Sequence, residues 1–238
     1  MRQWLGSIVY TVYLVLSVIV WGLVVAATIP LPRRVGYRLC RYWANAAIFL
    51  LKLLCGLDYA VEGRERLPKR NAVVLVKHSS TWEAIVQWKI FPTQTWVIKR
   101  ELMWVPILGW ALRALRPIAI NRSAGRSAVQ QVIEQGKRCL ADGLWVVIFP
   151  EGTRVPAGRS GRYGISGALL ASEAGTPVVP VAHNAGDYWP RRSWLKRAGT
   201  IKVVIGDPIP TAGREPREVT EEVREWIEKT LAEIRPAP

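Results

Sequence analysis

Residues 72–84 read AVVLVKHSSTWEA, and this stretch predicts both the fold and the position of a reactive site. It opens with the apolar, β-branched run Ala72–Val76, which is typical of a buried strand. His78 follows the end of that run, and residues 79–81 (SST) form a helix-start signal. Glu83 falls in the first turn of the expected helix. We therefore expect an imidazole where a buried strand stops, with a carboxylate five residues further on.

The contact between His78 and Glu83 depends on where this helix begins. In a continuous helix, five residues rotate by about 500°, which would leave the two side chains on different faces. If the helix starts only at Ser80, the loop can fold the imidazole back over the first turn. Glu83 would then orient the imidazole and leave its other nitrogen free as a general base. The same residues also fit a capping box, in which Glu83 bonds to the Ser80 backbone, and the two roles are compatible.

A second stretch, LWVVIFPEGTR at residues 144–154, runs from a buried strand into a loop suited to an anion. Gly152 lets the backbone approach a ligand, Thr153 supplies a hydroxyl, and Arg154 can bind phosphate through two parallel hydrogen bonds. Open α/β sheets bind ligands at such strand ends. The P-loop pattern GxxxxGK[ST] is missing from the sequence. An ordinary tight turn with a solvated arginine is the simpler alternative.

Basic side chains follow two other expected strands. Lys99 and Arg100 come after one of them and Arg122 after the other, so they would face the same ridge as the first histidine. The apolar segment Trp104–Trp110 would line an acyl groove or contact lipid, or it would be an ordinary buried helix. The second histidine, His183, also lies at a strand end, where a single histidine is more often structural.

Strand-like apolar runs alternate with helical patterns from residue 73 onward, which predicts an α/β fold with a mixed, mostly parallel sheet flanked by helices. The expected strands are Val73–Lys77, Thr95–Lys99, Pro117–Asn121, Trp145–Phe149, Val178–Ala182 and Ile201–Ile205. The expected helices lie near Glu83–Ile90, Trp104–Leu115, Ser123–Ala141, Ile165–Ala174 and Glu215–Ile234.

The N-terminal part of the chain is expected to associate with a membrane. Gly6–Ile29 carries no charge and can cross a bilayer core, which takes about 20 residues. The run is too long for a cleaved signal peptide. Four arginines between residues 33 and 41 place the body on the cytoplasmic side, but Arg2 favours that side as well. Both a single span and a re-entrant hairpin fit this pattern.

A shorter apolar stretch, Tyr42–Leu57, predicts an interfacial helix, with a core helix as the alternative. Glu62–Asn71 (EGRERLPKRN) is polar, contains Gly and Pro, and predicts a turn or linker. We therefore divide the chain into an N-terminal membrane-anchoring helical region at residues 1–60 and an α/β domain at residues 61–238.

Composition narrows the classes of function. The 238 residues carry a formal charge of +15, from 33 Lys and Arg against 18 Asp and Glu, which suits anionic partners. Nucleic acid is disfavoured because the basic residues are scattered and no RNP-like motif or zinc-finger spacing occurs. Twelve tryptophans favour a membrane interface. Three cysteines, far apart, predict no disulfide framework.

Four blocks in this order resemble the glycerolipid acyltransferase family of the 1-acyl-glycerol-3-phosphate acyltransferase type. They are KHSSTWEA, which contains the H-x4-D/E pattern; KRELMWVPILGW with PIAINR; FPEGTR; and TPVVPVAHNAG. The match extends from about Val73 to Gly186. Glu83 stands where the commonest form of the motif has Asp, which keeps the carboxylate.

The resemblance implies transfer of a fatty acyl group from acyl-CoA or acyl-ACP to the 2-hydroxyl of 1-acyl-glycerol-3-phosphate (lysophosphatidic acid), giving phosphatidic acid. His78 would be the general base and Glu83 would orient it. The implied substrate-binding residues are Lys99, Arg100, Arg122, Glu151, Gly152, Thr153 and Arg154. The thioester is a co-substrate, and neither a cofactor nor a metal is implied.

The implied partners are the bilayer, lysophosphatidic acid, and acyl-CoA or acyl carrier protein, with no nucleic acid. The implied location is a membrane, the bacterial inner membrane, with the catalytic domain facing the cytoplasm. Two alternatives stay open. One is an acyltransferase for another lyso-lipid, such as a lysophospholipid or lyso-ornithine lipid. The other is a non-enzymatic basic protein that binds membrane lipid.

Overall fold

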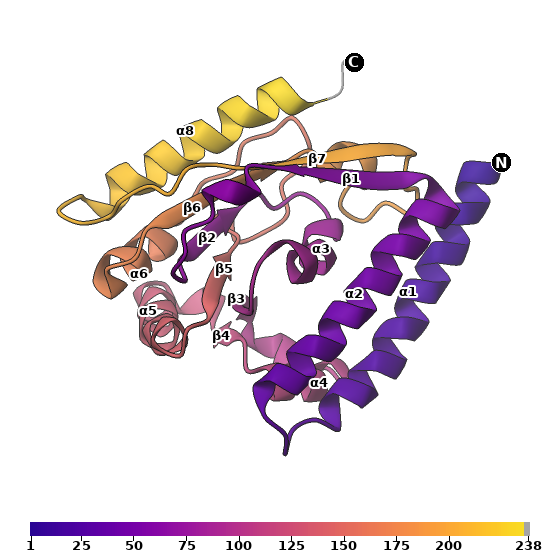
Figure 1. The fold of residues 1–238 in the computed structure, drawn as a ribbon, viewed down its shortest axis with the longest axis horizontal. Helices are drawn as coiled ribbons and strands as arrows, with labels where there is room; N and C mark the ends of the chain where they lie inside the picture. Colours follow the sequence, from indigo (N-terminus) through magenta and orange to yellow (C-terminus); the bar gives the residue numbers. More distant parts are fainter. Residues whose placement is uncertain (236–238) are drawn as a thin grey trace.

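A seven-stranded sheet forms the centre of the molecule in the computed structural model, which describes residues 1–235 (Figure 1). The strand order is β1-β7-β6-β2-β5-β3-β4, and all neighbours pair in parallel except β6 and β7. The strands are β1 Leu57–Glu62, β2 Val73–Val76, β3 Gln94–Lys99, β4 Ile118–Ile120, β5 Trp145–Ile148, β6 Val178–His183 and β7 Gly199–Ile205. The predicted mixed, mostly parallel sheet is therefore confirmed, and β1 is an additional strand.

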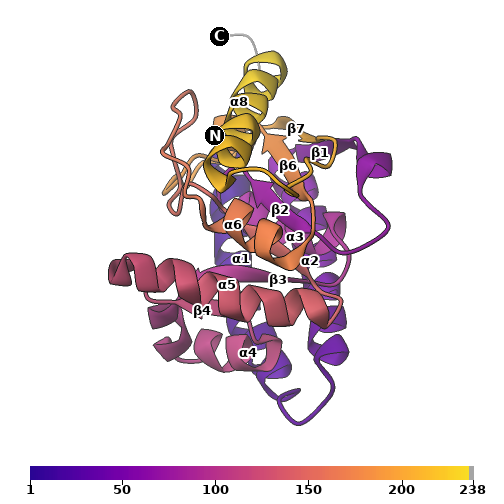
Figure 2. The ribbon, with the colours of Figure 1, turned by 90° about the vertical axis from the view of Figure 1, so that its left-hand side faces the viewer.

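Helices cover both faces of this sheet (Figures 1 and 2). The α-helices are α1 Arg2–Ala26, α2 Arg33–Cys55, α3 Trp82–Ile90, α4 Leu108–Leu115, α5 Arg126–Ala141, α6 Ser166–Ala174, α7 Ala185–Tyr188 and α8 Pro216–Ile234. Three short 3-10 helices are η1 Arg64–Arg66, η2 Arg100–Trp104 and η3 Arg122–Ala124. Helices α2 and α3 cover one face, with α1 packed outside α2, and α5, α6 and α8 cover the other.

Two apolar cores follow from this layering, one on each face of the sheet. Strands β2 and β5 are buried along their whole length, because helices cover both of their faces. Val74 and Val147 belong to the core under α2 and α3, whereas Val73 and Val146 belong to the core under α5, α6 and α8. This alternation is the two-residue period of a strand, and it explains why these runs are continuously apolar in the sequence.

The parallel strands set the position of the polar residues singled out by the sequence. Strands β6, β2, β5, β3 and β4 run in the same direction, so their carboxyl ends lie along one edge of the sheet. His78 follows β2, the PEGTR loop follows β5, and the basic residues near 99 and 122 follow β3 and β4. His183 is the last residue of β6. The fold thus gathers these side chains at a single edge.

The N-terminal helices form a hairpin that packs along the body (Figure 1). At one end of α1, Ser7 Oγ accepts a hydrogen bond of 3.0 Å from the backbone N–H of Lys196. Near the other end, Gly22 lies against Ile107, which precedes α4. The outer face of α1 is apolar and exposed. The boundary predicted at residues 60–61 falls inside β1, and the hairpin shares a core with the α/β body.

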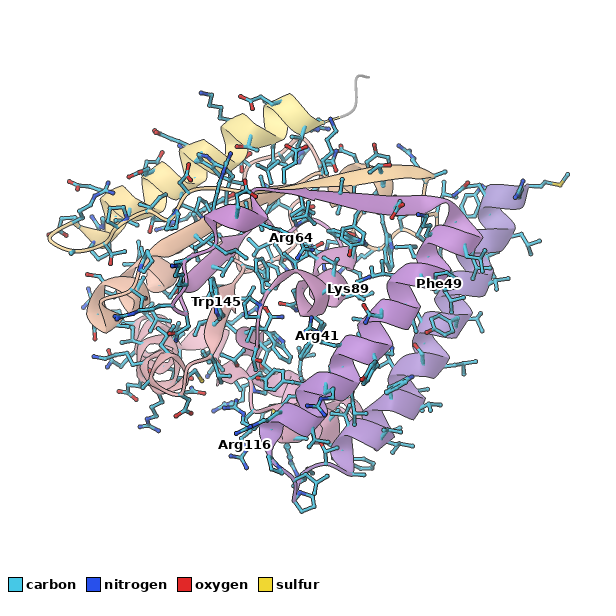
Figure 3. The ribbon with its side chains drawn as sticks, in the orientation of Figure 1. Arg41, Phe49, Arg64, Lys89, Arg116 and Trp145 are labelled. Carbon is cyan, nitrogen blue, oxygen red and sulfur yellow. The ribbon has the colours of Figure 1, made fainter. Side chains whose placement is uncertain are left out.

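Helix α2 begins at Arg33, nine residues before the apolar stretch that predicted it, and ends where Gly56 adopts a left-handed φ of 65°. Its buried residues recur every three to four positions and join the core, while Phe49 and other large side chains on its outer side are exposed (Figure 3). The core alternative therefore describes the inner face of this helix, and the interfacial location of its outer face stays a prediction.

The helix predicted at Trp104–Leu115 is interrupted. Leu108 N–H donates to the Pro106 carbonyl over 2.7 Å, and Ile107 between them has φ 64° and ψ −59°, which is a strained three-residue γ-turn. Pro106 disfavours helical geometry at the residue before it, so the helix restarts as α4 only at Leu108.

Candidate active site

The loop between β2 and α3 brings His78 and Glu83 together. Strand β2 stops at Val76 and α3 starts at Trp82, so the intervening residues are not helical. His78 Nδ1 lies 2.8 Å from Glu83 Oε1. The break between strand and helix is thus the feature that permits the contact, because a continuous helix would separate these side chains.

Glu83 is buried and its carboxylate is surrounded by donors. It accepts backbone N–H bonds from Ser79 at 3.0 Å and from Ser80 at 2.8 Å. The Ser80 hydroxyl accepts from the Trp82 N–H, so only the glutamate half of the predicted capping box forms. Burial alone would raise the pKa of Glu83, but the hydrogen bonds from His78 and from the Ser80 N–H lower it below its ordinary value. The carboxylate is therefore ionised at neutral pH.

His183 supports Glu83 from beneath. Its Nε2 lies 2.8 Å from the Lys77 carbonyl and 4.0 Å from Glu83 Oε2, and its Nδ1 accepts the Ala185 N–H at 3.3 Å. These partners assign the proton to Nε2, because a carbonyl only accepts and a backbone N–H only donates. Burial lowers the pKa of His183, so its ring is neutral. It is a fixed wall of the site rather than a second base.

The second ring nitrogen of His78 is left for chemistry. The imidazole stacks on Phe149, with ring centroids 4.2 Å apart and an interplanar angle of 21°. Its side chain is 14% exposed, which is enough for a reactant to reach the ring. Within residues 1–235, Nε2 has no hydrogen-bond partner. An oriented imidazole with one free nitrogen can act as a general base.

The PEGTR loop clamps the backbone of His78 from both sides. Glu151 Oε2 accepts the His78 N–H over 2.8 Å, and the His78 carbonyl accepts the Val155 N–H over 2.8 Å. The Glu151 side chain is fully buried, and its Oε1 binds Lys77 Nζ at 2.8 Å. The structure therefore places Glu151 beneath the loop rather than at its surface, where a substrate would bind.

Arg122 and the last three PEGTR residues, Gly152 to Arg154, lie on the surface of this edge. Gly152 has φ 65°, which a side chain would strain, and its carbonyl accepts a hydrogen bond from Arg122 Nη1. Thr153 is exposed. Arg154 is half-buried, and its Nε is buried without a partner among the described residues. This combination leaves a hydroxyl and guanidinium groups for an anionic ligand.

Lys99 and Arg100 lie at the same edge, but their side chains contact η2. Lys99 Nζ is 3.6 Å from Glu101 Oε1, and the Arg100 guanidinium lies 5.8 Å from the centre of the Trp104 ring. Both residues are exposed. The structure thus joins His78 with Glu83, and Arg122 with Gly152. Lys99 and Arg100 flank these two pairs.

Lys77 and Phe149 are functional neighbours that sequence reasoning missed. Lys77 is buried and binds both Glu151 and Glu228, the latter at 2.9 Å. A charged residue at the end of a fully buried strand must find a partner, and this was the available signal for Lys77. Nothing in the local sequence of Phe149 indicated that it stacks on an imidazole 71 residues earlier.

Comparisons with known proteins agree with this arrangement. The acyltransferase family model matches residues 58–184. A 1-acyl-sn-glycerol-3-phosphate acyltransferase from Pseudomonas aeruginosa is 43% identical over 98% of this chain and 93% of its own length. One from Saccharomyces cerevisiae is 30% identical over 86% of this chain and 70% of its own length.

A solved structure shares the fold. The crystal structure of a 1-acyl-sn-glycerophosphate acyltransferase from Thermotoga maritima superposes with a TM-score of 0.80, at 23% identity, over 100% of this chain and 98% of that one. The family model covers the strands that carry His78, Glu151 and His183. The chain belongs to the acyltransferase family, which includes these 1-acyl-sn-glycerol-3-phosphate acyltransferases.

Proposed function

We propose that this protein transfers a fatty acyl group from a thioester, acyl-CoA or acyl-ACP, to the 2-hydroxyl of 1-acyl-glycerol-3-phosphate. The observation that carries the proposal is the His78–Glu83 contact of 2.8 Å, with the other imidazole nitrogen free at an edge rich in arginine. The names of the relatives support the acceptor, and the base pair supports the chemistry.

His78 acts on the acceptor hydroxyl in this mechanism. Its Nε2 takes the hydroxyl proton as the oxygen attacks the thioester carbonyl carbon. The new C–O bond forms, the C–S bond breaks, and the proton passes from His78 to the departing thiolate, giving an ester and a free thiol. Glu83, ionised and bonded to Nδ1, holds the ring and stabilises the imidazolium. No cofactor other than the thioester co-substrate takes part.

The exposed cations bind the acceptor phosphate. Arg122 and Arg154 come from two loops that meet at Gly152, so they can contact one phosphate together. Thr153 adds a hydroxyl, and Lys99 with Arg100 adds positive charge at the same edge. Glu151 keeps its buried position and acts on His78 rather than on the substrate.

Apolar surface for the acyl chain and the bilayer lies beside this edge. A cavity of about 160 Å³ is lined by α1, α2 and α4, and an open groove of about 380 Å³ separates α1 from Val105–Leu108. Helix α1 is one candidate span by length and hydropathy, but it packs on the body at both ends. We propose that the hairpin lies in one leaflet of the bacterial inner membrane, with the body in the cytoplasm.

His78→Ala tests the proposed reaction. The purified protein in detergent is incubated with acyl-CoA or acyl-ACP and a panel of lyso-lipids, and ester formation is measured. We expect transfer to 1-acyl-glycerol-3-phosphate by the wild type and a loss of about 10²-fold or more in the variant, at unchanged Tm. Equal turnover by the variant would contradict the mechanism. If the wild type acylated only another lyso-lipid, that lipid would be the acceptor instead of 1-acyl-glycerol-3-phosphate.

Arg154→Ala tests the phosphate site separately. We expect a higher KM for the phosphorylated acceptor and an unchanged KM for the thioester, because a guanidinium–phosphate contact is lost. Arg113→Ala, an exposed arginine on α4, is the matched control. An equal rise in both KM values would argue against an acceptor phosphate at Arg154.

A further inference from the structure

A cavity of about 200 Å³ with charged and polar side chains in its walls lies beside His78, on the side of the sheet covered by α8, and the proposed chemistry does not use it. Its walls come from the ends of β2 and β6, from the loop at residues 157–159 and from the last turns of α8. The polar side chains that line it include Lys77, Ser79, Arg159, His183, Asp187 and Glu228.

The cavity reaches the catalytic loop through Ser79, the residue next to His78. Ser79 is buried, and its hydroxyl has no hydrogen-bond partner among residues 1–235. Gly186, another lining residue of the cavity, lies directly against Ser79: a Cβ at this position would come within 2.9 Å of Ser79 Oγ. A buried hydroxyl without a partner, in the wall of this cavity, is suited to a ligand that carries amide or carbonyl groups.

The strand order separates this cavity from the acceptor side. His78 follows β2, in the middle of the sheet, with β5, β3 and β4 on one side and β6 on the other. The arginines assigned to the acceptor phosphate follow β5 and β4. The cavity lies at β6, and the part of the β5–α6 loop that reaches it is residues 157–159, beyond Arg154. Figure 2 shows α8 at one end of the molecule and α4, next to the apolar groove, at the other.

Direct transfer requires both substrates at His78 at once, because the hydroxyl attacks the thioester without an acyl-enzyme. The lipid acceptor arrives from the side of α1 and α4, where the apolar surface lies. The water-soluble donor therefore needs a second approach to the same imidazole. Among the cavities of the described chain that touch the His78 loop, this one has a polar, cationic rim.

The rim carries one cation that is not engaged in an ion pair within residues 1–235. Lys77 is neutralised by Glu151 and Glu228, and Arg235 binds Asp187 at 2.8 Å. Arg159 is exposed, and its carbonyl accepts a 3.3 Å bond from Lys77 Nζ, which fixes its backbone. An exposed guanidinium on a fixed loop suits a phosphate group.

We infer that this cavity binds the 4′-phosphopantetheine arm of the acyl donor, with its phosphate at Arg159, its amides near Ser79 and its thioester toward His78. This arm is common to acyl-CoA and acyl-ACP, so one cavity would serve both donors. The inference rests on the proposed acyl transfer, and it adds the path by which the donor enters: between α8 and the loop at residues 157–159.

Arg159→Glu against Arg162→Glu is the matched test. Both arginines are exposed on one loop, but only Arg159 lines the cavity. We expect Arg159→Glu to raise KM about tenfold for acyl-CoA, acyl-ACP and acyl-phosphopantetheine, with acceptor KM within twofold. Acyl-pantetheine, which lacks the phosphate, should respond less than twofold, as should every donor with Arg162→Glu. Equal effects of the two variants would overturn the inference, and so would an effect confined to acyl-CoA.

Binding without turnover separates this inference from the proposed function. Desulfo-CoA, which cannot react, is titrated into the wild type, Arg159→Glu and Ala157→Trp, whose indole would fill the cavity. We expect about tenfold weaker binding by both variants at unchanged Tm. Unchanged binding would overturn the cavity assignment. A wild type that binds desulfo-CoA in this way but acylates no lysophosphatidic acid would overturn the proposed function and leave the cavity standing.

Discussion

Glu83 connects the loop that carries His78 to the helix that follows it. The same carboxylate accepts hydrogen bonds from the His78 imidazole and from the backbone N–H groups of Ser79 and Ser80. The local sequence predicted the contact with His78, provided that the helix starts at Ser80, and the bond to the Ser80 backbone, because the capping pattern and the strand end lie within one short segment. A substitution at Glu83 can therefore separate the helix-start role from the proposed catalytic role.

Glu83→Gln keeps an oxygen for the backbone N–H groups but removes the charge opposite the imidazole. We expect kcat to fall about 10²-fold or more while Tm changes little, because the imidazolium loses its stabilising carboxylate. Steady-state kinetics and thermal unfolding in detergent measure the two effects. A large loss of Tm with nearly normal kcat would show that Glu83 serves only the helix start.

Glu151→Gln distinguishes a buried support from a substrate ligand. The variant keeps an acceptor for the His78 N–H but leaves Lys77 with Glu228 as its only anionic partner among the described residues. We expect a stability loss of about 3 kcal/mol, as for a broken buried ion pair, and an acceptor KM within twofold of the wild type. A specific rise in acceptor KM at normal stability would return Glu151 to the substrate-binding group predicted from the sequence.

His183 makes stability depend on pH. Burial lowers the pKa of His183 below its ordinary value of about 6.5, so the unfolded chain takes up a proton that the folded chain refuses. Where the unfolded state binds more protons, the free energy of unfolding rises with pH. Stability should therefore fall as the pH drops below about 6.5. The pKa of Glu83 is also lowered in the folded chain, so the stability that Glu83 contributes is lost at lower pH, below about 4.3.

His183→Gln should remove the first of these two steps, because glutamine does not titrate. Urea unfolding between pH 5 and 8 measures the slope, with His78→Ala as the background, since the chain has two histidines. The variant should be less stable at pH 8, where it loses the fit of the imidazole between Lys77 and Ala185. An unchanged slope below pH 6.5 would assign the pH dependence to other groups.

At the scale of elements, the contact between α1 and the start of α4 depends on a glycine. A Cβ on Gly22 would lie 2.7 Å from Ile107 Cγ2, and Ile107 is held in the γ-turn. We expect Gly22→Leu to cost about 1–3 kcal/mol through overpacking, which lowers Tm by about 2–12 °C for a chain of this size. Val24→Leu, on the exposed face of α1, is the control and should leave Tm unchanged. Equal shifts would show that the helix does not pack here.

The central strands were predictable, and the edge strand was not. β2 and β5 are buried on both faces, so their sequences are uninterrupted apolar runs. β1 reads LDYAVE, is half-exposed, and follows directly after α2, so its sequence shows neither an apolar run nor a preceding turn. The γ-turn before α4 also escaped prediction, because a positive φ at an isoleucine is stabilised by the surrounding structure rather than by the residue.

At the candidate site, the contacts that could be predicted were those between residues close together in the sequence. His78 and Glu83 are five residues apart, so local geometry predicted their contact. The clamp of Glu151 on His78 and the ion pair of Lys77 with Glu228 join residues 73 and 151 positions apart. The first contact exists because the parallel sheet brings β2 and β5 side by side. The second exists because α8 packs on β6, the other neighbour of β2. Strand order, which the sequence does not state, therefore decides what supports the imidazole.

At the scale of the whole molecule, the hairpin is part of the body rather than an appendage. Tyr10 and Val25 of α1 belong to the core, and Lys196 is buried between α1 and the rings of Tyr10 and Trp189. Removing α1 would therefore expose core surface and take from Lys196 its contacts with Ser7, Thr11 and Tyr10. The exposed apolar face of α1 and the catalytic edge keep a fixed relation to each other.

This fixed relation has a consequence for kinetics. An acceptor that reaches the active site along the apolar groove beside α1 arrives from the bilayer plane, so its effective concentration is a surface density. We expect the rate to follow the mole fraction of lysophosphatidic acid in mixed micelles. Adding inert detergent at a constant total amount of acceptor should slow the reaction, because the mole fraction of acceptor falls. Raising detergent and acceptor by the same factor keeps the mole fraction constant and should not slow it. Rates that follow the bulk concentration would show that the acceptor enters from water.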